Sequence, residues 1–131
     1  MREMAETDSE ETRILVVEDE SLIALDIVAR LEAVGYRNVS IAATGEGAIR
    51  EAERMRPHLI LMDITLKGDM DGIEAAGIIR DRLGTPVIYV TAYSDPAVRD
   101  WAMATSPAGF ILKPFTTGDL ICAVRRALRP V

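Results

Sequence analysis

From Arg13 onward the sequence alternates five short apolar runs with stretches of helical periodicity. This alternation is typical of consecutive strand and helix units that build a parallel sheet, and the apolar runs suit strands buried on both faces. We therefore predict an α/β fold. Its strands are expected at residues 14–17, 39–42, 59–62, 87–90 and 109–112.

A helix is expected after each strand, with starts near Ser21, Gly45, Gly72, Asp95 and Thr117. Asp95 followed by proline is a strong start, because aspartate is a favoured N-cap and proline suits the first helical turn. The first helix is predicted to end at Gly35 and to cover the sheet with a broad apolar face. That face would consist of Leu22, Leu25, Ile27, Val28 and Leu31.

The length of 131 residues is enough for one domain with its own hydrophobic core. We predict this domain over residues 13–131. Residues 1–12 contain five acidic residues, one arginine and no periodic pattern, so they are predicted to be a disordered acidic leader.

Composition excludes several kinds of site. A single cysteine, Cys122, and a single histidine, His58, cannot assemble a disulfide framework or a zinc site of the usual Cys/His type. Apolar runs are too short to cross a bilayer and the N-terminus is acidic, so we expect a soluble, cytoplasmic protein without a membrane partner. The formal net charge of −6 gives no support to nucleic-acid binding.

Polar residues follow four of the five predicted strands. They are Glu18, Asp19 and Glu20 after the first strand, Asp63 after the third, Thr91 after the fourth and Lys113 after the fifth. Ligands of open parallel sheets bind at the carboxyl ends of the strands, so these side chains are expected to share one cleft. Taken singly, each has a simpler explanation: Glu18 and Glu20 as acids near a helix start, and Thr91 as an N-cap.

Carboxylates gathered in one cleft repel each other, which favours a cation among them. A hard, oxygen-liganded ion such as Mg²⁺ fits, and it usually binds one or two carboxylates together with phosphate oxygens. Asp63 would then be free to act as a nucleophile toward a phosphoryl group. Lys113 and Thr91 are placed to hold the phosphoryl oxygens.

Four motifs, VVEDE, LMDITL, VTAYS and FILKPF, resemble those of the receiver domains of two-component signalling, and the resemblance covers residues 13–128. It implies a doubly wound, flavodoxin-like fold, with strand order 2-1-3-4-5 and helices on both faces. It also implies roles for six residues. Asp63 would be the phosphoacceptor and a Mg²⁺ ligand, Asp19 a direct ligand, Glu18 a ligand through water, Thr65 a ligand through its carbonyl, and Lys113 and Thr91 the phosphoryl contacts.

The same resemblance implies a signalling switch rather than an enzyme, catalysing only its own phosphorylation and slow dephosphorylation. The phosphodonor would be a sensor histidine kinase or a phosphotransfer protein. Phosphorylation would move Thr91 and Phe110 and change the surface around the fourth helix, the fourth and fifth strands and the fifth helix. An unidentified downstream protein, or a second copy of the chain, would bind there. Phe110 could instead be a permanently buried core aromatic.

Two positions would tune the lifetime of the phosphoryl group in this family, here Thr65 and Tyr93. A bulky Tyr93 is predicted to shield the acyl phosphate from water, which implies slow self-dephosphorylation. The alternative is that Tyr93 faces a partner.

The sequence departs from the family in the loop at residues 66–72. Common receivers have Met-Pro and then Met-Asp-Gly after the acceptor, whereas this loop reads LKGDMDG, without the proline and with one residue more. Lys67 and Asp69 are expected to be solvated loop charges, although contact with the site stays open. Trp101 in the fourth helix is expected to be buried or half-buried, the alternative being an exposed signalling face.

Three other functions are compatible with parts of the pattern. A small-molecule phosphatase or phosphotransferase with an aspartate nucleophile would need a second acid where Thr65 stands. A flavodoxin-like FMN protein would need a phosphate-binding loop where the acids follow the first strand. A phosphorylation-independent interaction module would be expected to lack the acceptor or an acid, and none is missing.

Overall fold

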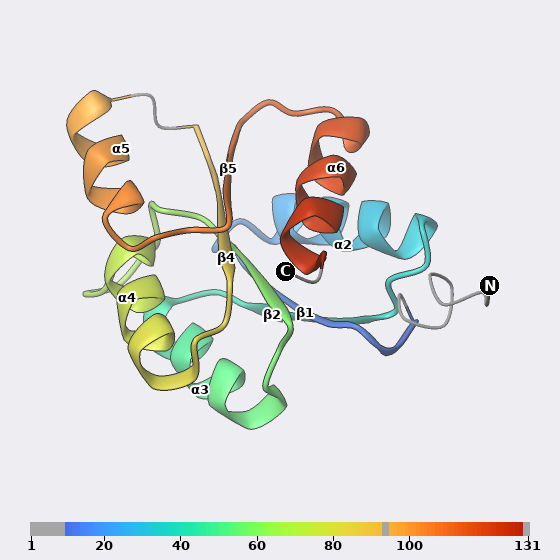
Figure 1. Ribbon diagram of the computed structural model, residues 1–131, viewed down its shortest axis with the longest axis horizontal. Helices are drawn as coiled ribbons and strands as arrows, with labels where there is room; N and C mark the ends of the chain where they lie inside the picture. The colour runs from blue at the N-terminus through green and yellow to red at the C-terminus, as the bar shows by residue number, and fades with distance from the viewer. Residues whose placement is uncertain (1–9, 93–94, 130–131) are drawn as a thin grey trace.

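The computed structural model describes residues 10–92 and 95–129 (Figure 1). Strands and helices alternate along this part of the chain, as predicted. In chain order they are β1 (Arg13–Val17), α2 (Ser21–Ala33), β2 (Asn38–Ala42), α3 (Gly45–Met55), β3 (Leu59–Met62), α4 (Gly72–Leu83), β4 (Val87–Thr91), α5 (Pro96–Met103), β5 (Gly109–Leu112) and α6 (Thr117–Leu128). None of the helices in these ranges is long and apolar enough to cross a membrane. Most of the predicted leader, residues 1–9, lies outside the described residues.

The strands form one parallel sheet in the order β2-β1-β3-β4-β5, which confirms the predicted flavodoxin-like topology. Helices α3, α4 and α5 cover one face of the sheet, and α2 and α6 cover the other (Figure 1). Since successive side chains of a strand point to opposite faces, the central strands supply two hydrophobic clusters. Leu15 and Tyr89 belong to the first, and Ile14 and Leu61 to the second.

Burial on both faces holds for the three central strands only. Every residue of β3 and β4 is buried, as are residues 14–17 of β1. The prediction is wrong for the two edge strands: Ile41 in β2 is 42% exposed and Leu112 in β5 is 44% exposed. An edge strand has a neighbour on one side only, so an apolar residue there is less completely covered.

Helix α2 covers the sheet with a narrower face than predicted. Its buried residues are Ala24, Ile27 and Leu31, which follow helical spacing. Leu22 and Leu25 were predicted to belong to this face, but they are 82% and 57% exposed. Their angular positions on the helix place them away from the sheet.

The prediction for Trp101 is also wrong. The side chain is 51% exposed on α5, whereas the neighbouring Ala102 is fully buried. Ala102 packs into the cluster beneath α3, α4 and α5, and Val98 packs against the same cluster while partly buried. Ala102 and Val98 therefore pack α5 against the sheet, and Trp101 lies outside the core.

The start of α4 packs directly against the end of β3. Asp71 forms a capping box with Glu74, in which each side chain accepts the other residue's N–H, at 2.9 and 3.3 Å. Gly72 donates its N–H to the carbonyl of Ile64 at 2.9 Å. A Cβ on Gly72 would lie 1.9 Å from the carbonyl oxygen of Asp63, so only glycine allows this approach.

Candidate functional site

The residues that follow the strands are held by hydrogen bonds that continue the sheet. These bonds run from Glu18 N–H to Ala42 at 3.0 Å, from Asp63 N–H to Val17 at 3.0 Å and from Lys113 N–H to Thr91 at 2.9 Å. Because Val17 and Met62 are paired in register, Glu18 and Asp63 leave the sheet side by side. The sheet itself therefore brings these two acids together.

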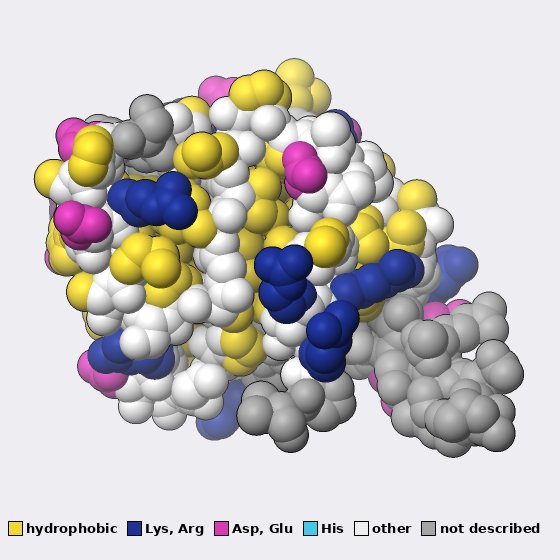
Figure 2. Space-filling model, turned by 45° about the horizontal axis from the view of Figure 1, so that its top comes forward, with side chains coloured by type: hydrophobic (Ala, Val, Ile, Leu, Met, Phe, Trp, Pro, Cys, Tyr) yellow, Lys and Arg dark blue, Asp and Glu magenta, His cyan; other side chains and the backbone are white. Residues whose placement is uncertain are grey.

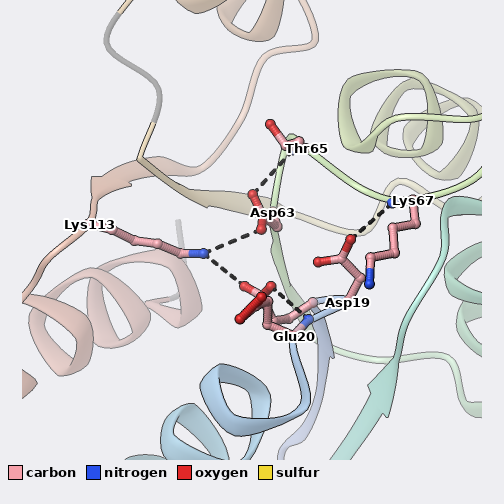
Figure 3. A network of polar contacts seen from close by, with 7 residues as sticks. Asp19, Glu20, Asp63, Thr65, Lys67 and Lys113 are labelled. Carbon is pink, nitrogen blue, oxygen red and sulfur yellow. Dashed lines mark hydrogen bonds and ion pairs between the residues drawn. The ribbon is translucent and has the colours of Figure 1, made fainter.

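The ammonium of Lys113 lies between two buried carboxylates (Figure 3). Its Nζ donates to Glu18 Oε1 at 2.8 Å and to Asp63 Oδ2 at 3.3 Å. Glu18 is only 4% exposed and Asp63 only 8%. Buried carboxylates are costly unless they are paired and hydrogen-bonded, so this lysine stabilises both charges.

Backbone N–H groups bind three further carboxylate oxygens. Glu20 donates to Glu18 Oε2 at 3.1 Å, Thr65 to Asp63 Oδ1 at 3.2 Å and Lys67 to Asp19 Oδ2 at 3.0 Å (Figure 3). Each bond restricts the rotation of one carboxylate. The three acids are thus held in defined orientations by donors from two loops.

Burial raises the pKa of the Asp63 carboxyl to about 6, and the charge of Glu18 acts in the same direction. The Lys113 charge and the Thr65 N–H act against this rise. For Lys113, burial lowers the pKa, but the hydrogen bond to Glu18 and the charges of Asp63 and Glu18 outweigh burial and raise it. At neutral pH the lysine is therefore charged and Asp63 is mainly an ionised, nucleophilic carboxylate.

The donor set fits a divalent cation. Glu18, Asp19 and Asp63 each offer one oxygen, and these oxygens lie within 4.8 Å of one another. Three carboxylates and one ammonium leave two uncompensated negative charges, which is the charge that a divalent cation balances. Carboxylate oxygens are the ligands that Mg²⁺ prefers.

A cleft of about 800 Å³ opens beside Asp63. It is lined by Asp63, Thr65, Thr91, Ala92, Asp95, Pro96 and Lys113. Thr91 is only 1% exposed and ends β4, so its position is set by the sheet. The Asp63 carboxylate, a lysine and a hydroxyl residue thus share one open space.

The sequence matches the family model of the response regulator receiver domain over residues 14–125. This chain belongs to that family. It is a response regulator receiver domain, and receiver domains are signalling switches.

Among curated relatives, the receiver domain is 34% identical over 116 residues to the transcriptional regulatory protein PdtaR of Mycobacterium tuberculosis, covering 88% of this chain and 56% of PdtaR. It spans about half the length of the curated relatives that it matches.

Two solved structures share the fold over nearly their whole length. The receiver domain of the sensor histidine kinase PA1611 from Pseudomonas aeruginosa is 34% identical, with a TM-score of 0.81, over 89% of this chain and 97% of that one. That structure has a magnesium ion coordinated in its active-site cleft. A CheY-like receiver domain from Methanospirillum hungatei is 31% identical, with a TM-score of 0.83, over 89% and 93% of the two chains.

The receiver domain brings together six of the residues selected from the sequence. They are Glu18, Asp19, Asp63, Thr65, Thr91 and Lys113. Phe110 lies apart from them, half-buried, with its ring 6.0 Å from the Tyr89 ring and 4.8 Å from the Arg99 guanidinium. Tyr93 lies outside the described residues, so its role stays a prediction.

Two contributions to the site were missing from the sequence-based prediction. Asp95 was selected only as an N-cap; it does accept the Ala97 N–H at 2.9 Å, and it also lines the cleft. The Lys67 side chain is exposed, as expected, yet its backbone N–H reaches Asp19. The short link between Thr91 and α5 could have indicated that Asp95 lies at the cleft. No sequence signal marks the backbone N–H of Lys67 as a donor.

Proposed function

We propose that this receiver domain is a phosphorylation switch in which Asp63 accepts a phosphoryl group with the help of Mg²⁺. The observation that carries the proposal is the group of three carboxylates at the strand ends, bridged by Lys113 and open to a cleft. Such an arrangement is costly to stability, since buried like charges repel each other. A cation site that also receives a phosphoryl group accounts for that cost.

Asp19 and Asp63 would bind Mg²⁺ directly, and Thr65 through its backbone carbonyl. Glu18 would act through water. When bound, Mg²⁺ would neutralise the charge that builds up on the transferred phosphoryl oxygens.

The chemical step requires little beyond positioning and charge. A carboxylate oxygen of Asp63 attacks phosphorus, the bond from phosphorus to the donor imidazole nitrogen breaks, and the imidazole keeps that electron pair. Lys113 stays charged and donates to a phosphoryl oxygen, and the Thr91 hydroxyl donates to another. The donor would be a phosphohistidine on a sensor histidine kinase or a phosphotransfer protein.

The switching surface would be the face where α5 and α6 flank β5. Figure 2 shows apolar side chains between basic ones on this face. Phe110 and Leu112 lie in the hollow there, with Arg99 and Arg126 among its other lining residues. Movement of Thr91 toward the phosphoryl group and of Phe110 inward would change this face for a downstream protein or a second copy of the chain. Tyr93 and Thr65 would set the lifetime of the phosphoryl group on Asp63. We also propose that the protein is cytoplasmic.

Intact-mass spectrometry tests the proposal. Wild type, Asp63→Asn and the control Asp81→Asn are incubated with phosphoramidate, with Mg²⁺ or with a chelator. Asp81 is an exposed acid in the last turn of α4, whereas the first turn of that helix lies beside Asp63. We expect a single phosphoryl adduct on wild type and on the control, only with Mg²⁺, and none on Asp63→Asn. An unmodified wild type would favour a phosphorylation-independent binding module.

A further inference from the structure

The loop between β3 and α4 contacts the acid that follows β1. Lys67, in the middle of this loop, donates its backbone N–H to Asp19 Oδ2 at 3.0 Å, across 48 positions of sequence (Figure 3). The Lys67 side chain is exposed, and Asp19 is partly buried. The hydrogen bond is made by the main chain.

The loop is anchored on both sides of Lys67, so its N–H points in a fixed direction. Before it, Leu66 is 8% exposed and belongs to the hydrophobic cluster beneath α3 and α4. After it, Met70 packs so closely on Gly45, at the start of α3, that a Cβ there would be 2.9 Å from Met70 Cγ. Gly68 turns the chain next to Lys67 with a φ of +100°, a conformation that favours glycine.

This bond leaves Asp19 with one oxygen held and one oxygen to offer. A carboxylate commonly binds Mg²⁺ through one oxygen, and ligating carboxylates are usually held by a hydrogen bond to the protein. Holding Asp19 Oδ2 removes rotational freedom that metal binding would otherwise have to remove. The acid group of Glu18, Asp19 and Asp63 is compact, with one oxygen of each residue within 4.8 Å of the others.

We propose that the main-chain N–H of Lys67 is a positioning group that orients Asp19 for Mg²⁺, whereas the Lys67 side chain is dispensable. The inference rests on the proposed function, since it assumes that Asp19 is a metal ligand. Proline has no N–H, so this donor depends on the absence of the Met-Pro pattern of common receivers. The loop that departs from the family therefore contributes to the metal site through its backbone.

The test compares Lys67→Pro, which removes the N–H, with Lys67→Ala, which removes only the side chain. Mg²⁺ affinity is measured by titration calorimetry, and circular dichroism verifies the fold of each variant. We expect Lys67→Ala to bind Mg²⁺ within about twofold of wild type, and Lys67→Pro to bind it about tenfold more weakly, a typical cost of losing a group that orients a metal ligand. Equal affinities of the two variants would overturn the proposal.

A second measurement keeps the inference testable if Lys67→Pro does not fold. Amide hydrogen exchange of Lys67 is followed by NMR without metal, in wild type and in Asp19→Ala. We expect the Lys67 amide to exchange slowly in wild type and at least about tenfold faster in Asp19→Ala, because breaking a hydrogen bond exposes the amide. Equal exchange rates would overturn the proposal. If instead the amide is protected as expected but wild type binds no Mg²⁺, the proposed function is the part that fails.

Discussion

At the scale of single residues, the buried carboxylate of Asp63 lowers the stability of the folded protein once it is ionised. The carboxylate is 8% exposed and lies beside Glu18, and its pKa is raised to about 6 by burial and by that neighbouring charge. Since the folded-state pKa lies above the ordinary value of 3.8, the folded protein binds the proton more tightly than the unfolded chain does. Ionisation of Asp63 between about pH 4 and pH 6 therefore lowers the free energy of unfolding.

Replacing this carboxylate by a neutral isostere should stabilise the metal-free protein. In the presence of a chelator, we expect Asp63→Asn to exceed wild type by about 2 kcal/mol in free energy of unfolding at pH 8, with the difference approaching zero near pH 4. Lys113 keeps its bond to Glu18 in the variant, so no buried charge is left alone. Urea denaturation at several pH values measures the difference. A variant less stable than wild type at pH 8 would contradict this reading of the site.

At the scale of elements, the contact between α4 and β3 fixes the position of Asp63. Gly72 allows the first turn of α4 to lie on the backbone of Asp63, and the Asp71 capping box sets where that turn begins. A displaced α4 would move the Thr65 N–H, which holds Asp63 Oδ1. The same helix contains Gly77, where a Cβ would meet nothing within 4 Å.

These two glycines form a matched pair for a stability test. Gly72→Ala forces a Cβ into the Asp63 carbonyl and is expected to lower the free energy of unfolding by about 2–4 kcal/mol. Gly77→Ala improves helix propensity without a clash and is expected to raise it by roughly 0.5–1 kcal/mol. Chemical denaturation of both variants gives the comparison. If Gly72→Ala were as stable as Gly77→Ala, α4 would not pack on β3 as described.

The elements also show which parts of the fold were predictable. Central strands and helix starts follow from local patterns, because a buried strand is apolar throughout and caps such as Asp95 and Asp71 have a distinct chemistry. The exposure of Leu22 and Ile41 could not be predicted from the sequence, because an apolar side chain does not itself indicate which neighbours will cover it. The site was predictable for a topological reason: the carboxyl ends of parallel strands meet at one edge. The N–H of Lys67 was not, because every residue other than proline has one.

At the scale of the whole molecule, metal binding and folding are linked. A cation that binds the three acids in the folded protein, but does not bind the unfolded chain, stabilises the fold by mass action. The stability of the entire domain therefore reports on occupancy of a site made from the ends of β1 and β3. This linkage applies whether the receiver domain is studied alone or within a protein of the length of its relatives.

Mg²⁺ at about 100 times its dissociation constant should raise the free energy of unfolding by about 2.7 kcal/mol. For a domain of this size the melting temperature should rise by roughly 8–10 °C. Asp19→Asn removes a proposed metal ligand and should abolish most of the rise, whereas Asp81→Asn should retain it. Scanning calorimetry over a Mg²⁺ series measures the shift. An equal shift in Asp19→Asn would place the cation elsewhere.

Reductive trapping shows whether Asp63 itself forms the acyl phosphate. Wild type is phosphorylated by phosphoramidate with Mg²⁺ and then treated with borohydride, which reduces an aspartyl phosphate to homoserine, and the modified residue is located by tandem mass spectrometry. We expect homoserine at position 63 in the Mg²⁺ sample and unmodified aspartate there in the chelator sample. Homoserine at Asp19 with Asp63 intact, or no reduced residue at all, would contradict this expectation.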